Sequence, residues 1–190
     1  MRIVIQKNVL QAMSILASKK DVRYYLNGVC VIATEKMVRY VATDGHIMGL
    51  YQQERDGEND NGLGSLIIPN EVIAKLEKNV DLVLEQVNGQ WVVGTQLFTP
   101  IDGKFPDYQR VLPRGDVSNE VAQFNPDFIV RFQKVGKLLV KNAVPTIAHN
   151  GSGSSLVDIG HKDFIGVMMP IRTEKPLANV PLAFLDNVSV

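Results

Sequence analysis

The sequence predicts an α+β protein made of three repeated β-α-β-β-β units, with helices on one face and antiparallel sheets on the other. Three segments begin alike, each with a short apolar strand, then an Asn or a Pro-Asn pair, then an amphipathic helix; they are residues 2–16, 65–76 and 120–135. Strand-like runs follow each of them. Internal repetition is typical of proteins assembled from copies of one structural unit. A scaffold or a ring is therefore favoured over an enzyme with a single cleft.

The first unit is expected to begin with a strand over residues 2–6 and a helix over 8–18. Leu10 and Met13 recur at the spacing of one helix face. Three strands should follow the helix, at residues 24–34, 37–43 and 47–53. The polar, glycine-rich stretch 54–64 then predicts an exposed connector.

The second unit should contain a strand at 66–68 and a helix that starts at Pro69 or Asn70 and ends near Lys78. Its three later strands are expected at 80–87, 90–94 and 96–101. The Asn88-Gly89 pair separates the first two of these strands, and this dipeptide is typical of two-residue β-hairpin turns. Residues 102–119 contain prolines and predict an extended crossing segment.

The third unit is expected to begin with a strand at 120–124. Asn125 suits an N-cap and Pro126 suits the first helical turn. The helix should run to about Val140, with an apolar stripe that includes Phe128 and Phe132. Strands are expected near 146–149, 155–159 and 164–169. This organisation predicts a two-unit domain over 1–115, a half domain over 116–172 and a C-terminal tail over 173–190.

The composition limits the possible functions. The chain has 190 residues, 45% of them hydrophobic, which is enough for one or two globular cores. Its 20 Lys and Arg balance its 20 Asp and Glu. Because charge-driven nucleic-acid binders are usually basic, any contact with DNA is expected to be weak and local. The single Cys30, the absence of a signal-peptide pattern and the absence of a bilayer-spanning apolar run predict a cytoplasmic protein.

Four motifs occur in a fixed order: Asp-Val-Arg-Tyr-Tyr-Leu-Asn-Gly at 21–28, Val-Ala-Thr-Asp-Gly-His at 41–46, Asp-Gly-Lys-Phe-Pro-Asp-Tyr-Gln-Arg-Val-Leu-Pro at 102–113 and Val-Met-Met-Pro-Ile-Arg at 167–172. Together they closely resemble the bacterial sliding clamp, the beta subunit of DNA polymerase III. Residues 1–115 resemble its middle domain, and residues 120–172 resemble the second half of its last domain. The regions through which that clamp closes as a head-to-tail dimer have no counterpart here.

The resemblance implies a DNA-facing surface. In the family, helices line a central hole and the ring slides on double-stranded DNA without reading its sequence, as phosphate contacts allow. The residues implied to contact DNA are Lys20, Arg23, Tyr24, Tyr25, Lys75, Lys78, Lys134, Lys137 and Lys141. Lys7 and Lys19 also flank the first helix. Taken singly, each lysine is equally well explained by a solvated helix face, and one of the two tyrosines by the core.

The resemblance also implies a groove that binds short peptides of polymerases and other client proteins. Its residues, matched one by one, are Leu26, Thr43, Gly45, His46, Ile47, Met48, Pro106, Arg110, Val111, Val167, Met169, Pro170, Ile171 and Arg172. Methionines and branched aliphatics suit an adaptable apolar floor. The family usually has Arg-Leu after the His, where this chain has Ile47-Met48, which predicts a different peptide preference. The alternative is that these residues form ordinary core between two units.

No catalytic or cofactor-binding constellation is evident. Asp44, His46 and Asp107 could suggest acid-base chemistry, but the three histidines are far apart in the sequence and no metal-ligand spacing or phosphate-binding loop occurs. We therefore expect a non-catalytic protein without cofactors.

The expected function is that of a sliding-clamp-like DNA polymerase processivity factor, with a phage or prophage gene as one expected source. Because the chain has three units, a ring would need a homo-oligomer such as a tetramer. The alternative is a monomeric decoy or adaptor that competes for clamp-binding proteins without encircling DNA. The tail at 180–185 loosely resembles a clamp-binding peptide of the Leu-x-Leu-Phe type, and either occupation of the groove or simple packing of this tail on the sheet would explain it.

Overall fold

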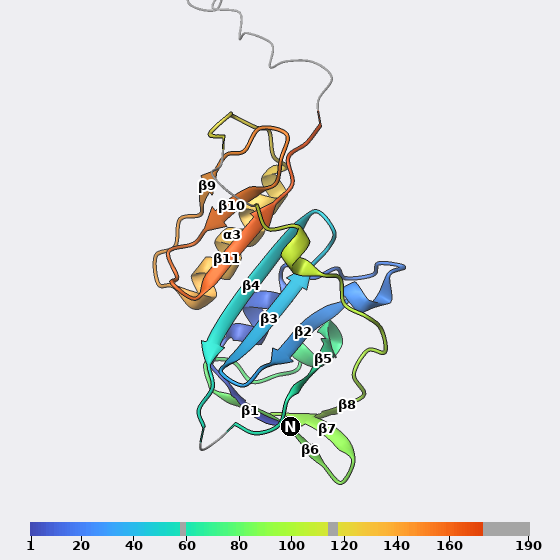
Figure 1. Cartoon of the computed structure of the whole chain (residues 1–190). Coiled ribbons are helices and arrows are strands. Elements are labelled where there is room, and N and C mark those ends of the chain that lie inside the picture. Colours follow the sequence, from blue (N-terminus) through green and yellow to red (C-terminus); the bar gives the residue numbers. More distant parts are fainter. Residues whose placement is uncertain (58–59, 114–117, 173–190) are drawn as a thin grey trace, which may run out of the picture.

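The computed structural model describes residues 1–57, 60–113 and 118–172. The described part consists of two antiparallel sheets and three helices (Figure 1). The helices are α1 (Val9–Ser14), α2 (Asn70–Ile73) and α3 (Pro126–Leu139), and single 3-10 turns lie at Tyr24–Leu26 and Tyr108–Arg110. The strands are β1 (Arg2–Ile5), β2 (Gly28–Ala33), β3 (Met37–Thr43), β4 (Ile47–Glu54), β5 (Gly64–Pro69), β6 (Leu82–Val87), β7 (Gln90–Val93), β8 (Gln96–Phe98), β9 (Thr146–Ala148), β10 (Ser155–Asp158) and β11 (Phe164–Met168).

The larger sheet joins the first and third units. Its seven strands have the order β5-β2-β3-β4-β11-β10-β9, and β4 pairs with β11 from Tyr51↔Phe164 to Ile47↔Met168. Helices α1 and α3 contact each other on one face of this sheet, and the segment 100–112 crosses the other face (Figure 1). The third unit is therefore tied to the first by a continuous hydrogen-bonded sheet.

The smaller sheet has the order β1-β6-β7-β8. Its β6–β7 hairpin turns at Asn88 and Gly89, whose φ angles are 50° and 81°. Positive φ at both central residues is the requirement of a type I′ turn, which matches the right-handed twist of the two strands. The hairpin predicted from the Asn-Gly pair is thus confirmed.

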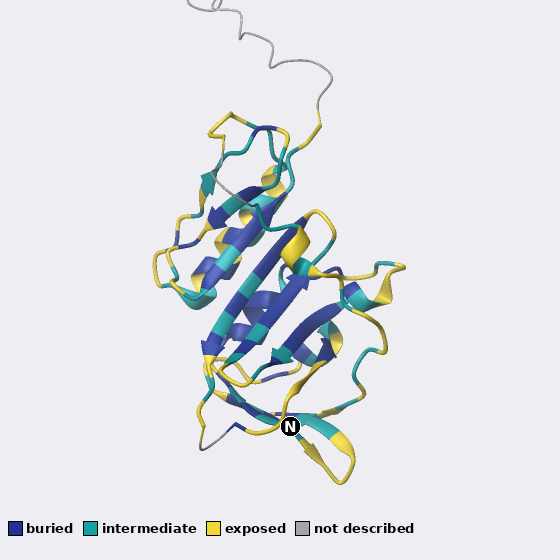
Figure 2. Ribbon diagram, viewed as in Figure 1, coloured by how far each residue is buried: buried dark blue, intermediate teal, exposed yellow. Residues whose placement is uncertain are grey.

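Side-chain alternation along the large sheet divides the apolar residues between two clusters. Most residues of the central strands β3 and β4 are buried or partly buried (Figure 2). The helix-side cluster holds most of the core, including the fully buried Tyr40, Tyr51 and Phe132. The cluster on the opposite face consists of Cys30, Val41, Met48, Ile67 and Val167, covered by partly buried side chains of residues 101–112. Burial raises the pKa of the Cys30 thiol to about 12, so this cysteine is a neutral core residue.

Two predicted helices are shorter than the sequence pattern indicates. α1 ends at Ser14 and α2 ends at Ile73, where predictions placed their ends near 18 and 78. In both cases the chain continues in tighter turns: the Leu16 amide donates to the carbonyl of Met13, and the Lys75 amide to that of Val72. These bonds span three residues rather than four, as is common at helix ends.

Two predicted strand segments are wrong. Residues 120–124 form no strand, because their backbone bonds go to separate loops; the Gly151 amide donates to Glu120 and the Ile171 amide to Gln123. Tyr24–Leu26 forms a 3-10 turn before β2. Asp21 and Asn27 close this turn, since the Asp21 amide donates to the Asn27 side chain, which in turn donates to the Asp21 carbonyl.

α3 is the helix that the sequence predicts best. It begins with Pro126 directly after Asn125, whose side-chain oxygen accepts the Asp127 amide at 3.0 Å.

The domain boundary predicted at 115–116 lies among residues 114–117, outside the described part, and stays a prediction. In the part of the chain that the structure describes, no helix has the length and apolar character that crossing a membrane requires.

We expect the substitution Asn125→Ala to lower the free energy of unfolding by about 1 kcal/mol, because it removes the side-chain acceptor at the N-terminus of α3. Urea unfolding followed by circular dichroism measures this change. Gln133→Ala, at an exposed position of the same helix, is the control and should have little effect. Equal losses for the two variants would contradict the capping role.

Candidate peptide groove and basic helix face

The turn between β3 and β4 is fixed by its own side chains. One carboxylate oxygen of Asp44, Oδ1, accepts the amides of His46 and Ile47, at 2.8 and 3.0 Å. The Thr43 hydroxyl donates to the Ile47 carbonyl and accepts the Gly45 amide. Gly45 has a φ of 94°, which an L-residue rarely adopts. The Thr-Asp-Gly-His motif is therefore a rigid, sharply closed turn.

The end of β11 meets this turn. Val167 lies opposite Met48 and Met168 opposite Ile47, and the Met169 amide donates to the His46 carbonyl at 2.9 Å. The pairing continues the sheet as far as the turn, so the segment 167–170 runs beside residues 46–48. Two motifs that are far apart in the sequence are thus brought into direct contact.

A buried apolar cluster lies on the face of the sheet opposite the helices. Met48 and Val167 belong to the buried cluster of this face, and Val111 packs against that cluster. The Ser154 hydroxyl donates to the Val111 carbonyl and so fastens the crossing segment to the third unit. At the other end of the 3-10 turn, Asp107 accepts the Gln109 amide and pairs with Arg110 at 3.1 Å.

The helix side of the molecule carries exposed lysines. The lysines implied to contact DNA are all exposed; they are Lys20, Lys75, Lys78, Lys134, Lys137 and Lys141. They come from all three units. Glu71 and Glu77 lie among the lysines of the second unit and are also exposed, so the positive charge there is partly offset.

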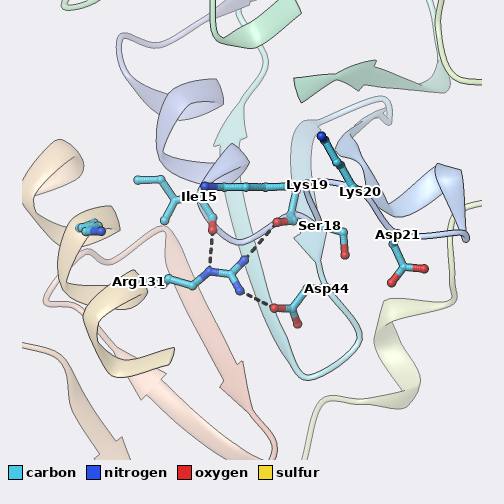
Figure 3. A pocket seen from close by; sticks show the side chains of 9 residues that line it. Ile15, Ser18, Lys19, Lys20, Asp21, Asp44 and Arg131 are labelled. Carbon is cyan, nitrogen blue, oxygen red and sulfur yellow. Dashed lines mark hydrogen bonds and ion pairs between the residues drawn. The ribbon is translucent and has the colours of Figure 1, made fainter. Parts of the chain in front are cut away.

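Arg131 of α3 connects this helix side to the turn (Figure 3). Its guanidinium donates to the carbonyls of Ile15 and Ala17, at 2.8 and 3.1 Å, and forms an ion pair with Asp44. Sequence reasoning missed this residue. One signal was available: on a helical wheel Arg131 borders the apolar stripe of Phe128 and Phe132, where a charged side chain usually has a partner.

A family model for the DNA polymerase III beta subunit, central domain, matches residues 4–107. The chain belongs to this family. Curated relatives include the beta sliding clamp of Pseudomonas putida, 35% identical over 118 residues that cover 57% of this chain and 32% of the relative. The beta sliding clamp of Vibrio cholerae is 36% identical over 106 residues, 51% of this chain and 28% of the relative. The chain thus spans about a third of the length of the curated clamps it matches.

Solved clamp structures match more of the chain than the sequence comparisons do. The DNA polymerase III subunit beta of Pseudomonas aeruginosa aligns with a TM-score of 0.70 at 20% identity, covering 91% of this chain and 66% of that one. The Helicobacter pylori beta clamp bound to DNA ligase peptide aligns with a TM-score of 0.68 at 14% identity, covering 90% and 66%. These likenesses confirm the predicted clamp fold.

Not all of the clamp-derived groove residues share one surface. Thr43, Met48, Val111, Val167, Met169 and Pro170 are buried or partly buried beside the turn, whereas Gly45, His46, Pro106, Arg110, Ile171 and Arg172 are exposed. Leu26 and Ile47 are each only 1% exposed. Ile47 belongs to the helix-side core, because strand alternation points it away from Met48. Ile47 therefore does not lie on the groove rim, and its side chain gives no basis for the predicted difference in peptide preference.

The two tyrosines implied to contact DNA have different environments. Tyr24 is 58% exposed, whereas Tyr25 packs against the cluster that contains Met48. The rings meet edge to face with centroids 5.8 Å apart. Arg23 pairs with Asp21 at 2.7 Å, and this hydrogen bond lowers the pKa of the Asp21 carboxyl to about 2. The partly buried position of Tyr25 agrees with the core alternative, and Tyr24 stays available for a ligand.

Metal binding was not expected from the sequence. Within residues 1–57, 60–113 and 118–172, no three His, Cys, Asp or Glu side chains gather in a way that could hold a metal ion. The tail at 173–190, including its peptide-like segment, lies outside the described residues.

Proposed function

We propose that this chain is a sliding-clamp-like processivity factor, which tethers a DNA polymerase or another client to DNA through the groove beside the Thr43–His46 turn. The observation that carries the proposal is the pairing of β11 with β4, which sets Met169 against His46. The clamp family and the clamp fold support the same function. The role is one of binding, without catalysis or a cofactor, in the cytoplasm.

The groove would hold a client peptide by burying its apolar side chains against the partly buried Val111, Met169 and Pro170, which lie at the edge of the buried cluster that contains Met48 and Val167. Flexible thioether side chains adapt to differently shaped ligands, which suits a surface that serves several clients. Exposed groups at the rim, such as His46 and Arg110, would contact the polar parts of the peptide. The Helicobacter pylori beta clamp was solved bound to a DNA ligase peptide, and a short peptide segment is the kind of ligand we propose here.

The helix face would contact double-stranded DNA through the exposed lysines. Such contacts neutralise phosphates and release counterions, so they carry no sequence information and weaken as salt rises. The zero formal net charge favours weak binding. The DNA and the client then meet on one scaffold, and tethering raises the effective concentration of the client at its site without any new chemistry.

Encircling DNA would need several copies of the 190-residue chain, and we propose a homo-oligomeric ring such as a tetramer. Light scattering of this chain at micromolar concentration tests the assembly. A mass of four chains supports the ring, and a mass of one chain excludes it. A phage or prophage gene stays our proposal for its source.

We expect the double substitution Met169→Ala, Pro170→Ala to weaken the binding of a fluorescein-labelled Leu-x-Leu-Phe peptide by about 1–3 kcal/mol, because it removes apolar contact area from the groove. Fluorescence anisotropy measures the affinity. Met37→Ala, at the opposite end of β3 from the turn, is the control and should bind normally. Unchanged affinity of the double variant would exclude this groove as the peptide site.

The alternative is an adaptor or decoy that binds the same clients without encircling DNA. The same groove supports it, because peptide binding needs no ring. Retention of the protein on circular but not on linearised DNA would favour the processivity factor. Equal loss from both DNA forms, combined with normal peptide binding, would favour the adaptor.

A further inference from the structure

A cavity of about 520 Å³ lies between the end of α1, the β3–β4 turn and α3 (Figure 3). Its charged lining consists of Lys19, Lys20, Lys134, Arg131, Asp21 and Asp44. The cavity therefore contacts both the basic helix face and the back of the turn that supports the groove.

The charges of this cavity are unbalanced. Both carboxylates already have cationic partners, since Asp21 pairs with Arg23 and Asp44 pairs with Arg131. The three lysine ammonium groups have no ion-pair partner among the described residues. Three uncompensated positive charges around this cavity attract an anion with several oxygen atoms. A phosphate group is such an anion, because its oxygens can accept hydrogen bonds from several ammonium groups at once.

Arg131 has donors left for such a ligand. A guanidinium has five N–H groups, and three of them donate to Ile15, Ala17 and Asp44. The remaining two have no partner in the described part of the chain. A phosphate group held by the lysines could therefore also bond to the guanidinium that restrains Asp44.

Asp44 links this guanidinium to the β3–β4 turn, because each of its two carboxylate oxygens contacts one of them. Oδ2 faces Arg131, while Oδ1 accepts the amides of His46 and Ile47. The His46 ring stacks on Phe128 of α3, with centroids 6.1 Å apart, and the His46 carbonyl accepts the Met169 amide. Displacing the Asp44 carboxylate would thus loosen the contacts that hold β11 to the turn.

We propose that the cavity binds a phosphate group, and that this anion, bonded to the free N–H groups of Arg131, repels the Asp44 carboxylate on the same guanidinium and so loosens the groove turn. The two anions share one guanidinium and repel each other at short range. Phosphate in the cavity and peptide in the groove then weaken each other's binding by the same factor, as linkage requires. The inference deepens the proposed function and rests on it only where a peptide is involved.

Amide hydrogen exchange tests the inference without any peptide. NMR measures exchange at Ile47 and Met169 in the whole chain, with inorganic pyrophosphate or a short duplex DNA added and ionic strength held constant with sodium chloride. We expect exchange at both amides to become about five-fold faster, with no change at Leu84 in the other sheet. Acceleration by pyrophosphate identifies any phosphate group as sufficient, whereas acceleration by duplex alone identifies the DNA backbone as the source.

The variant Lys19→Ala, Lys134→Ala should remove the acceleration. Lys36→Ala, an exposed lysine outside the cavity, directly before the start of β3, should retain it. Binding without acceleration, no binding of either probe, or equal acceleration in the cavity variant would overturn the inference. A Leu-x-Leu-Phe peptide should bind about five-fold more weakly when the effective anion is present. Failure of this peptide to bind at all would count against the proposed function, while the exchange result still decides the inference.

Discussion

Replacing Phe132 with alanine is expected to lower the free energy of unfolding by about 3–5 kcal/mol. Phe132 is fully buried on α3, and its ring packs edge to face on Phe164 of β11, with centroids 6.4 Å apart. The ring also fills the space above Gly166, where an added Cβ would lie 2.5 Å from it. The substitution therefore leaves a cavity between α3 and β11, the strand that pairs with β4.

Urea unfolding of the whole chain measures this loss. Val130→Ala is the matched control, because Val130 is on the same helix but 43% exposed, and its effect should stay within about 0.5 kcal/mol. If the third unit unfolds separately, the Phe132 variant should show two transitions. A loss for Phe132→Ala no larger than for Val130→Ala would contradict the packing of α3 on β11.

Replacing Arg131 with methionine should cost about 3 kcal/mol of unfolding free energy, because it leaves the largely buried Asp44 carboxylate without its partner. It also removes the donors to the carbonyls of Ile15 and Ala17. Arg131→Lys retains the charge, but its donors lie on a single nitrogen and do not match the three acceptors that the guanidinium reaches with three nitrogens. This variant should therefore recover only part of the loss.

A double-mutant cycle with Asp44→Asn separates the ion pair from the other bonds of Arg131. The sum of the unfolding free energies lost in the two single variants should exceed the loss in the double variant by about 0.5–3 kcal/mol, because substitutions of contacting residues do not have additive effects. Urea unfolding of the four proteins gives this coupling free energy. Simple additivity would show that Arg131 acts through the Ile15 and Ala17 carbonyls, and that the ion pair contributes nothing measurable.

Local sequence signals predicted the features that local chemistry determines. Asn125 and Pro126 define the start of α3, and the spacing of Phe128 and Phe132 defines its buried face. Asn88-Gly89 defines a hairpin because both residues tolerate positive φ. The family motifs predicted the clamp fold, which the family model and the structural comparisons confirm.

Features that depend on distant contacts could not be predicted in this way. The segment 24–26 reads as a strand, but reciprocal bonds between Asp21 and Asn27 close it into a turn. Arg131 lies on a helix that was expected to contribute only lysines and core residues, and its importance comes from Asp44, which is remote in the sequence. Ile47 was placed in the groove with its neighbour, although alternation along β4 points the two side chains to opposite faces.

β11 pairs with β4, although the paired residues are about 120 positions apart in the chain. Pairings between such remote segments are entropically expensive and tend to form late as a chain folds. A nascent polypeptide would therefore lack the proposed peptide groove until β11 had been added. Under the proposed function, client binding would begin only once β11 had paired with β4, so incompletely folded copies would not bind clients.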